Sequence, residues 1–488
     1  MPKTSFLFAI IFLFGLTDIQ AQLHRELFAN YELYRERSVE NRRFKHADLT
    51  RLVEKLESPL SYEVAGQSME GRDIYLIKAG NGPTKVLLWS QMHGDESTAT
   101  MALLDIFNFL GRQDGQSALR NRLLRDLTIY FIPMLNPDGA ERFQRRNALG
   151  IDINRDAKWL VTLEAQILKK VRDDVQAEWG FNLHDQSRYT AAGLTGQTAT
   201  VSFLAPAYNY EKEVNMVREN AMRLIGVMNK ALQAYIPGKV GRYNDDFEPR
   251  AFGDNIQKWG TSTILIESGG LEDDPEKQYI RKINYVAIMT ALQAIATREY
   301  QQTPVQEYDR IPFNESNQLF DLILRGVQIP YNNEWYPVDV GIRRQEVPFN
   351  EHHNFYYRSS IRDMGDLSTF SAYEELDAGD NYRTYFGQTY PNILSDLSEL
   401  KDLDVIGLLK NGYTHVQVQT VPEQAEIDQL PIKITPPGEI DDDDIVIGKN
   451  PSLLLVGRDG RVRHVLVNGF VFDLDQDQDR IATLIKFL

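Results

Sequence analysis

The sequence contains no cysteine among its 488 residues. This absence excludes disulfide bonds, thiolate nucleophiles, Cys-type zinc sites and iron–sulfur clusters. Histidine is also scarce, with eight residues in the whole chain. Any metal ion must therefore be held by histidine and carboxylate side chains, and a histidine near the end of a predicted strand is worth testing as a ligand.

An excess of positive charge is absent as well. Lysine and arginine number 53 against 69 acidic residues, which gives a net charge of −16. Nucleic acids and anionic membrane surfaces are therefore poor candidate partners. The composition, 42% hydrophobic and 25% charged, is that of an ordinary globular protein with ample material for a core. The length suggests roughly two to four domains.

Beyond the N-terminus, no segment approaches the ~18 consecutive apolar residues of a membrane-spanning helix. The N-terminus itself reads MPKTSFLFAIIFLFGLTDIQAQ, with a lysine, an apolar core over 6–16 and a cleavage site near 19–21. This layout predicts a secretory signal peptide over residues 1–21. An uncleaved N-terminal anchor is the alternative. We expect an exported protein, periplasmic or secreted, that keeps no stable membrane span after signal removal.

Apolar runs alternate with amphipathic patterns between residues 85 and 297. Segments 85–90, 127–135, 179–185 and 263–268 are predicted strands, whereas 98–111 and 159–178 have helical spacing. Such alternation predicts an α/β fold, with a mainly parallel or mixed central sheet flanked by helices. We assign residues 22–300 to this first domain.

The character of the sequence changes after residue 300. Residues 301–318 are polar and contain prolines, which predicts a linker. Residues 319–488 contain short β-like runs with turn signals such as Asn468-Gly469, which predict a smaller β-rich accessory domain.

Candidate functional residues fall at the ends of the predicted strands. In open α/β sheets, ligands bind beyond the carboxyl ends of the strands, and His93, His184 and Glu267 lie at or just past such ends. His93 and Glu96 are three residues apart, and Gly94 permits a tight turn between them. A HxxE pair alone is more often a surface ion pair.

Together, His93, Glu96 and His184 have the composition of a catalytic zinc site. Two histidines and one glutamate hold zinc and leave the fourth position open to water. Glu267 closes an apolar strand, where an acid is costly to bury without a task, and it is the candidate for a proton-shuttling carboxylate that binds no metal. A paired structural acid is the alternative at this position.

Several stretches, in order, resemble the zinc metallocarboxypeptidases of the carboxypeptidase A/B type. They are GQSMEGRDIYLIKAG (66–80), HGDE, NPDGAERFQRRNALGIDINRD (136–156), HDQ and ILIESGG. The resemblance covers roughly residues 28–296. It implies the zinc carboxypeptidase fold, with His93, Glu96 and His184 holding one Zn²⁺ and Glu267 as general base and acid.

The same resemblance assigns roles to four further residues. Arg145 matches the arginine that helps to polarise the scissile carbonyl, with Arg142 or Arg146 as alternatives. Asn154 and Arg155 match the pair that binds the terminal carboxylate of the substrate, and a guanidinium suits this role because it forms two parallel hydrogen bonds to a carboxylate. Tyr243 matches the mobile tyrosine near the substrate terminus, with a packed loop aromatic as the alternative.

We therefore expect a zinc-dependent metallocarboxypeptidase that removes the C-terminal residue from peptides or peptide-like substrates with a free terminal carboxylate. A zinc amidase on the same scaffold, acting on peptidoglycan peptides or acylated amino acids, is one alternative. An inactive binding module is another.

Two C-terminal fragments resemble the small β-domain of amidohydrolases. They are FDLILRGVQI with YPVDVGI, and SLLLVGRDGRVRHVLVNGFVFD. The metal motif of those enzymes, His-x-His, is absent from residues 301–488. We expect no catalytic role for this part of the chain.

Overall fold

The computed structural model describes residues 23–379, 381–439 and 444–486. The predicted signal peptide, residues 1–21, lies outside these ranges. Among the described residues, no helix combines the length and the apolar character needed to cross a membrane. The chain divides into two units, Met1–Ser316 and Asn317–Leu488, and each is described by itself.

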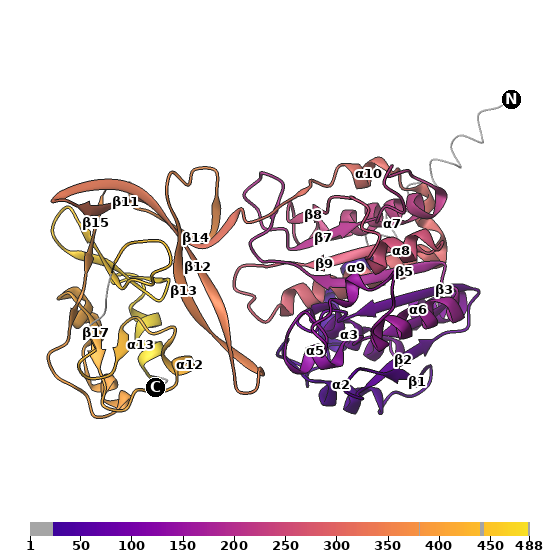
Figure 1. Ribbon diagram of the computed structural model, residues 1–488, viewed down its shortest axis with the longest axis horizontal. Helices are drawn as coiled ribbons and strands as arrows, with labels where there is room; N and C mark the ends of the chain where they lie inside the picture. Colours follow the sequence, from indigo (N-terminus) through magenta and orange to yellow (C-terminus); the bar gives the residue numbers. More distant parts are fainter. Residues whose placement is uncertain (1–22, 380, 440–443, 487–488) are drawn as a thin grey trace. The chain divides into compact units, whose positions relative to one another are not determined.

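An eight-stranded sheet forms the centre of the first unit (Figure 1). Its strands are β1 (Leu60–Gln67), β2 (Asp73–Ala79), β3 (Thr84–Ser90), β4 (Leu127–Ile132), β5 (Trp179–Asp185), β7 (Val201–Leu204), β8 (Val240–Arg242) and β9 (Ser262–Ser268). They lie in the order β1-β2-β4-β3-β5-β9-β7-β8. Pairing is parallel across the central strands β4, β3, β5 and β9 and again between β7 and β8, and antiparallel elsewhere. The predicted α/β class with a mixed sheet is confirmed.

Helices cover both faces of this sheet. They are α2 (His46–Val53), α3 (Thr98–Gly111), α4 (Ser117–Asp126), α5 (Pro137–Glu141), α6 (Leu163–Val175), α7 (Met216–Leu232), α8 (Phe252–Lys258) and α9 (Gln278–Thr297), with short helices η1 (Tyr31–Leu33) and η2 (Ile153–Arg155). Along β3, Val86 and Leu88 pack into the core shared with α3, α7 and α9, whereas Leu87 and Trp89 pack with α6 and α8. Burial on both faces explains why this strand is a continuous apolar run.

Helix α6 is shorter than the predicted segment 159–178. The left-handed backbone of Leu160, with φ 52°, precedes it. The hydroxyl of Thr162 then accepts a hydrogen bond from the backbone NH of Ala165 at 3.2 Å and caps the helix. Gln176, with φ 54°, ends it. Local capping therefore ends α6 within the longer segment, 159–178, whose apolar residues have helical spacing.

Most of the predicted linker, 301–318, packs on the first unit. It contains the end of η3 (Glu299–Gln302), helix α10 (Gln306–Asp309) and strand β10 (Asn314–Glu315), which pairs with β6 (Ala191–Ala192). Tyr308 and Ile311 are each only 2% exposed, and the backbone NH of Ala205 donates to the Tyr308 hydroxyl at 3.2 Å. The structure differs from the expectation here because two buried side chains anchor an otherwise polar segment.

The second unit is rich in β-structure. Its strands are β11 (Leu319–Tyr331), β12 (Glu334–Phe349), β13 (Asn354–Gly365), β14 (Ser371–Asp377), β15 (Tyr382–Phe386), β16 (Gln388–Thr389), β17 (Tyr413–Gln417), β18 (Lys433–Thr435), β19 (Leu453–Gly457), β20 (Val462–Val467) and β21 (Phe470–Asp473). A larger sheet has the order β13-β12-β11-β15-β19-β20-β21, with β14 beside β11, and β16, β17 and β18 form a second sheet. The helices are η4 (Leu397–Asp402), α11 (Val405–Lys410), α12 (Gln424–Ile427) and α13 (Gln478–Lys486).

The predicted turn at Asn468-Gly469 is confirmed. Val467 pairs with Phe470 across it, and both turn residues have positive φ, 46° and 73°. This is the conformation that Asn-Gly favours in two-residue hairpin loops. The turn thereby fixes the position of the Asn468 side chain in the second unit.

Candidate metal centre and catalytic pocket

The candidate site lies at the carboxyl ends of the central parallel strands. His184 is the last residue but one of β5, and Glu267 holds the same place in β9. The two residues are direct partners in the parallel register, so their side chains project from the same face of the sheet. His93 and Glu96 lie in the loop between β3 and α3 rather than on the helix. The topology thus brings four residues from three distant segments to one edge.

Gly94 is required by close packing rather than by an unusual φ. A Cβ atom at this position would lie 2.0 Å from the carbonyl carbon of Gly139 and 2.3 Å from the backbone nitrogen of Ala140. The loop that carries His93 and Glu96 therefore presses directly on α5. This contact places the two side chains beside β5.

His93, Glu96 and His184 form the only group of three or more metal-ligating side chains found among the described residues. The Nδ1 atom of His93 lies 2.7 Å from one carboxylate oxygen of Glu96, and the Nδ1 atom of His184 lies 2.7 Å from the other. The two Nδ1 atoms are 3.1 Å apart. Ligands about 2.1 Å from a tetrahedral zinc ion are separated by about 3.4 Å, so the three groups fit zinc with small outward shifts.

The electrostatics of the cluster favour an ionised glutamate. Burial opposes the charge on Glu96, but the facing imidazoles of His93 and His184 outweigh it and lower its pKa. All three side chains are nearly inaccessible to solvent. A carboxylate and two imidazoles that face one another in a buried space are the donor set of a zinc site.

Asp152 is a functional candidate that the sequence analysis missed. One carboxylate oxygen lies 3.0 Å from Nε2 of His93, on the side of the ring away from the cluster. Such a bond fixes the tautomer and the orientation of a metal-binding imidazole. Burial opposes its charge, but the bonds to His93 and Arg145 lower the pKa of Asp152. Asp152 lies within the motif 136–156, two positions before Asn154, and this position is the only feature of the sequence that could have indicated its role.

Glu267 lies beside the cluster and outside the set of three metal-ligating side chains. Burial, together with the carboxylates of Glu96 and Asp185, raises the pKa of Glu267 well above its ordinary value. A carboxylate whose pKa is raised is a stronger base than an ordinary carboxylate, which favours its use in proton transfer. The position and the environment of Glu267 therefore suit a general base and acid.

Arg145 reaches the cluster from the motif 136–156. Its Nη1 atom lies 3.1 Å from Nδ1 of His93 and 3.2 Å from the Glu96 carboxylate, and its Nη2 atom lies 3.0 Å from Asp152. Its side chain stays 43% exposed to the pocket. By contrast, Arg142 bonds to Glu70 and the carbonyl of Asp138. Of these two arginines, only Arg145 is placed to act on a group at the cluster.

Asn154 and Arg155 line the same pocket. The Asn154 side-chain oxygen accepts a hydrogen bond from the backbone NH of Phe252 at 2.9 Å, which leaves its NH₂ group as a donor. Nε of Arg155 lies 3.7 Å from Glu248, and the Arg155 side chain is 39% exposed. The guanidinium is therefore accessible to a ligand carboxylate.

Tyr243 also faces the pocket. Burial and the neighbouring carboxylates of Glu267 and Glu96 raise the pKa of its phenol, so the hydroxyl stays protonated and able to donate a hydrogen bond. The pocket has a volume of about 420 Å³ and brings together every site residue predicted from the sequence. Its further lining residues are Asn182, Asp185, Gln186, Ser187, Leu204, Pro206, Asp246, Glu248, Ala251, Gly253, Asp254 and Leu265.

Part of this lining is acidic, which the sequence analysis did not predict. Asp254, at the start of α8, accepts a hydrogen bond from the backbone NH of Glu248 at 2.9 Å. Burial raises the pKa of Asp254 to about 7. Glu248 itself is paired with Arg250 at 2.8 Å. This segment, 246–254, has no regular spacing of acids that a sequence pattern would reveal.

Residues 46–225 match the family model described as zinc carboxypeptidase. The chain is 28% identical to the human carboxypeptidase N catalytic chain over 145 residues, 24% of this chain and 30% of that protein. It is 27% identical to carboxypeptidase SOL1 of Arabidopsis thaliana over 97 residues, 19% of this chain and 20% of that protein. The alignments therefore span less than a third of either relative.

Solved structures of carboxypeptidases are also similar. A metallo-carboxypeptidase from Burkholderia cenocepacia has a TM-score of 0.41 at 17% identity, covering 52% of this chain and 69% of that one. Carboxypeptidase A from Helicoverpa armigera has a TM-score of 0.42 at 13% identity, covering 58% and 81%.

The family match confirms the resemblance predicted from the motifs. It implies one Zn²⁺ per chain, and the three-residue cluster offers the ligand atoms for it. The matched range includes the cluster, Arg145, Asn154 and Arg155 but ends before Tyr243 and Glu267. The assignment of these last two residues rests on their position in the pocket.

Proposed function

We propose that this chain is a zinc-dependent metallocarboxypeptidase that hydrolyses the C-terminal amino acid from peptides. One observation carries this proposal: a metal-binding triad, an uncoordinated acid and two accessible arginines line one pocket. His93, Glu96 and His184 would hold one Zn²⁺, which when bound would supply Lewis acidity and lower the pKa of a bound water to about 7.

Glu267 carries the proton transfers. Its carboxylate accepts a proton from the attacking water and then donates it to the departing amine. The raised pKa of Glu267 supports the first half of this cycle, because a carboxylate of ordinary pKa is a weak base and accepts a proton poorly. Arg145 places positive charge beside the oxygen on which negative charge develops, and Tyr243 offers a phenolic donor in the same pocket.

Arg155 and Asn154 recognise the C-terminal end of the peptide substrate. A guanidinium and a side-chain amide donate hydrogen bonds to both oxygens of a terminal carboxylate. This contact positions the last peptide bond of the substrate beside Glu267. Internal peptide bonds lack the carboxylate, which is why we expect cleavage at the C-terminus only.

A zinc amidase acting on peptidoglycan peptides or acylated amino acids would use the same metal and base, so only its substrates distinguish it. An inactive binding module is disfavoured, since every catalytic group lines the pocket. We also propose that the protein is exported to a periplasm or outside the cell, supported by the sequence of residues 1–21.

Mass spectrometry of a digested peptide library tests the proposal. The purified protein is incubated with peptides that end in free carboxylates and with matched peptides that end in amides, with and without a chelator. We expect free-acid peptides to lose one C-terminal residue only when metal is present. Cleavage at internal bonds, or equal cleavage of both sets, contradicts the proposal, and selective cleavage of acylated amino acids identifies the amidase.

A further inference from the structure

A second pocket lies in the second unit, with a volume of about 500 Å³. It lies over strands β11, β15 and β19, which are neighbours in the larger sheet. Six of the residues that line it are Gln328, Asn381, Arg383, Tyr385, Val456 and Arg458. The volume falls within the range of sites for small organic ligands, about 300–1,000 Å³.

The register of the strands places this lining on one face of the sheet. Arg383 of β15 pairs with Gln328 of β11 and with Val456 of β19, which forms one row across three strands. Tyr385 lies two residues further along β15 and therefore projects from the same face as Arg383. Thr384, between them, points to the opposite face and is only 1% exposed. The sheet thus holds the groups of this pocket in fixed positions.

Two arginines of the pocket have no acidic partner. Neither Arg383 nor Arg458 forms a salt bridge with any carboxylate in the described ranges, and none of the lining residues that the structure describes is acidic. The carboxylate of the adjacent Asp459 is engaged elsewhere, because it accepts hydrogen bonds from the backbone NH of Arg461 at 3.1 Å and from the Arg463 guanidinium at 2.6 Å. The pocket is therefore positive and attracts anions.

Aromatic rings lie beside one of these arginines. The guanidinium of Arg383 lies over the ring of Trp335, 4.8 Å from its centroid, and the centroids of the Trp335 and Tyr385 rings are 5.2 Å apart. This contact orders the guanidinium before a ligand binds, which lowers the entropic cost of binding. The Tyr385 side chain is 41% exposed. An exposed aromatic ring beside a polar pocket suits packing against the C–H face of a sugar ring.

The combination of groups indicates the class of ligand. The guanidinium groups of Arg383 and Arg458 each bind a carboxylate through two parallel hydrogen bonds. The side-chain amide of Asn381, which also lines the pocket, can both donate to and accept from a hydroxyl group. A bare inorganic anion would use the two arginines alone, whereas a sugar acid uses the arginines, the amide and the aromatic ring.

We propose that this pocket binds an oligosaccharide that contains uronic acids. Its carboxylates bind Arg383 and Arg458, its hydroxyl groups bind Asn381, and one sugar ring packs on Tyr385. The second unit is thereby a binding module for acidic glycans. This role is independent of the reaction proposed for the first unit, and it keeps the protein close to material that carries such glycans.

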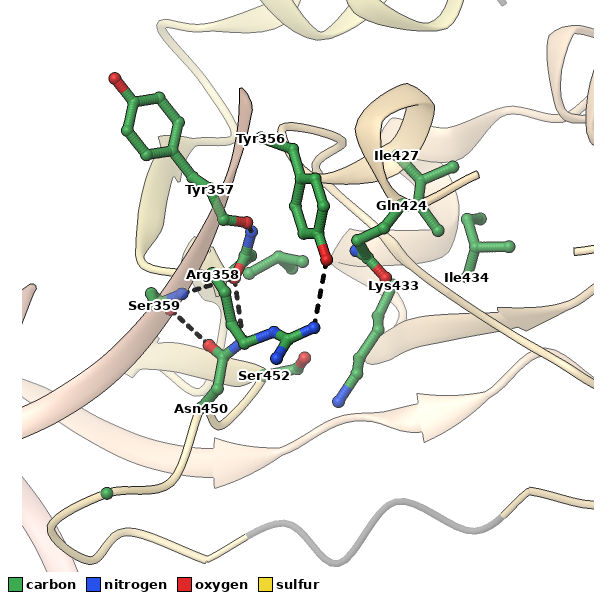
Figure 2. A pocket seen from close by; sticks show the side chains of 13 residues that line it. Tyr356, Tyr357, Arg358, Ser359, Gln424, Ile427, Lys433, Ile434, Asn450 and Ser452 are labelled. Atoms are coloured by element: carbon green, nitrogen blue, oxygen red, sulfur yellow. Dashed lines mark hydrogen bonds between the residues drawn. The ribbon is translucent and has the colours of Figure 1, made fainter. Parts of the chain in front are cut away.

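A different pocket of the same unit provides a matched control. Arg358 lines that pocket, and its guanidinium donates a hydrogen bond to the Tyr356 hydroxyl at 3.2 Å (Figure 2). Arg358 is exposed, as are Arg383 and Arg458, and it lies outside the lining of the proposed glycan site. The substitution Arg358→Met therefore removes an equal charge from the same unit and leaves the proposed site intact.

Isothermal titration calorimetry on the full chain tests this site. The probes are trigalacturonate, its trimethyl ester as the neutral match, and propionate as a carboxylate without a sugar ring. The protein carries Arg145→Ala and Arg155→Ala, so that carboxylates no longer bind the arginines of the catalytic pocket. We expect trigalacturonate to bind at least about tenfold more tightly than either of the other probes, because only trigalacturonate offers both the charges and the rings.

Single substitutions locate the binding. Arg383→Met and Arg458→Met each remove one charge, and each is expected to weaken the binding of trigalacturonate about tenfold or more. Tyr385→Ser removes the ring and should weaken binding about two- to tenfold, whereas Tyr385→Phe keeps the ring and should retain it. Arg358→Met should leave the affinity unchanged. Thermal unfolding of every variant checks that its fold is preserved.

Several results would overturn this inference. No binding of trigalacturonate up to about 10 mM, a concentration that detects even millimolar affinity, would exclude the site. Equal binding of the trimethyl ester or of propionate would show that the pocket does not recognise a sugar acid. Unchanged affinity in both Arg383→Met and Arg458→Met, or a loss in Arg358→Met alone, would place the glycan elsewhere. Unchanged affinity in Tyr385→Ser would exclude packing of a sugar on this ring.

Discussion

Glutamine at position 267 would separate the catalytic role of Glu267 from a structural one. The substitution Glu267→Gln exchanges a carboxylate for an amide of nearly equal size, so packing at the end of β9 is preserved. It removes the only function that an amide cannot perform, which is to accept and return a proton near neutral pH.

The expected loss follows from the role of a general base. Proton transfer by a positioned side chain contributes about 10²- to 10⁴-fold to rate, which corresponds to about 2.7–5.5 kcal/mol of barrier. We expect kcat to fall by at least ~10²-fold. Zinc content is expected to stay at one ion per chain, because the three ligand side chains are unchanged.

The metal-free Glu267→Gln variant is expected to be at least as stable as the wild type, although its turnover falls. Burial and the carboxylates of Glu96 and Asp185 raise the pKa of Glu267 in the folded metal-free protein. The folded state therefore retains a proton that the unfolded state releases, and folding loses stability as the pH rises through the folded pKa. Glutamine escapes this penalty, so metal-free Glu267→Gln should unfold at equal or higher denaturant concentration, increasingly so at higher pH.

Steady-state kinetics, zinc quantification and urea unfolding on the same preparations check these expectations. Glu164→Gln is the control, since Glu164 is another buried glutamate, bonded to Asn147 and to the backbone NH of Met69 and absent from the pocket lining. It should retain normal turnover. Near-normal turnover in zinc-loaded Glu267→Gln would refute the assignment of Glu267 as the base.

Three further predictions concern the same pocket. Asp152→Asn removes the carboxylate that orients His93, and should weaken zinc affinity about 10- to 100-fold; unchanged affinity in a competition assay with a chromogenic chelator would exclude this role. Arg155→Ala should reduce the preference for free-acid over amidated peptides by at least about tenfold, because it removes a charge-assisted hydrogen bond. An undiminished preference in paired kcat/KM measurements would mean that another group binds the terminal carboxylate. Asp254→Asn tests the raised pKa of Asp254, about 7 against an ordinary 3.8. Because the folded protein keeps a proton that the unfolded chain releases, the stability of the wild type relative to the variant should fall by up to about 4 kcal/mol between pH 4 and pH 8. Parallel pH profiles of urea unfolding for the two proteins would contradict this prediction.

Much of the first unit could be predicted from the sequence because its strands are buried on both faces. Such strands are continuous apolar runs, and the rule that ligands bind at their carboxyl ends placed His184 and Glu267 correctly at one edge. His93 and Glu96 could be predicted in the same way, because they follow the carboxyl end of the apolar strand β3. The boundaries of α6 were less accurate, since capping by Thr162 depends on local hydrogen bonds rather than on periodicity.

Other features depend on contacts that no spacing reveals. The hydrogen bond of Asp152 to His93 joins residues 59 positions apart, and an aspartate in a loop has no distinctive pattern. Residues 301–316 look polar, yet Tyr308 is buried. The reason for Gly94 was also different from the one expected, because the chain needs space against Gly139 rather than a special backbone angle.

Anomalous X-ray diffraction at the zinc edge, on crystals of the zinc-saturated protein, tests the central claim most directly. We expect one peak about 2.0–2.2 Å from Nδ1 of His93, Nδ1 of His184 and the Glu96 carboxylate, with Glu267 nearby but not bound to the ion. A peak at other residues, no peak at this cluster, or Glu267 as a direct ligand would contradict the account.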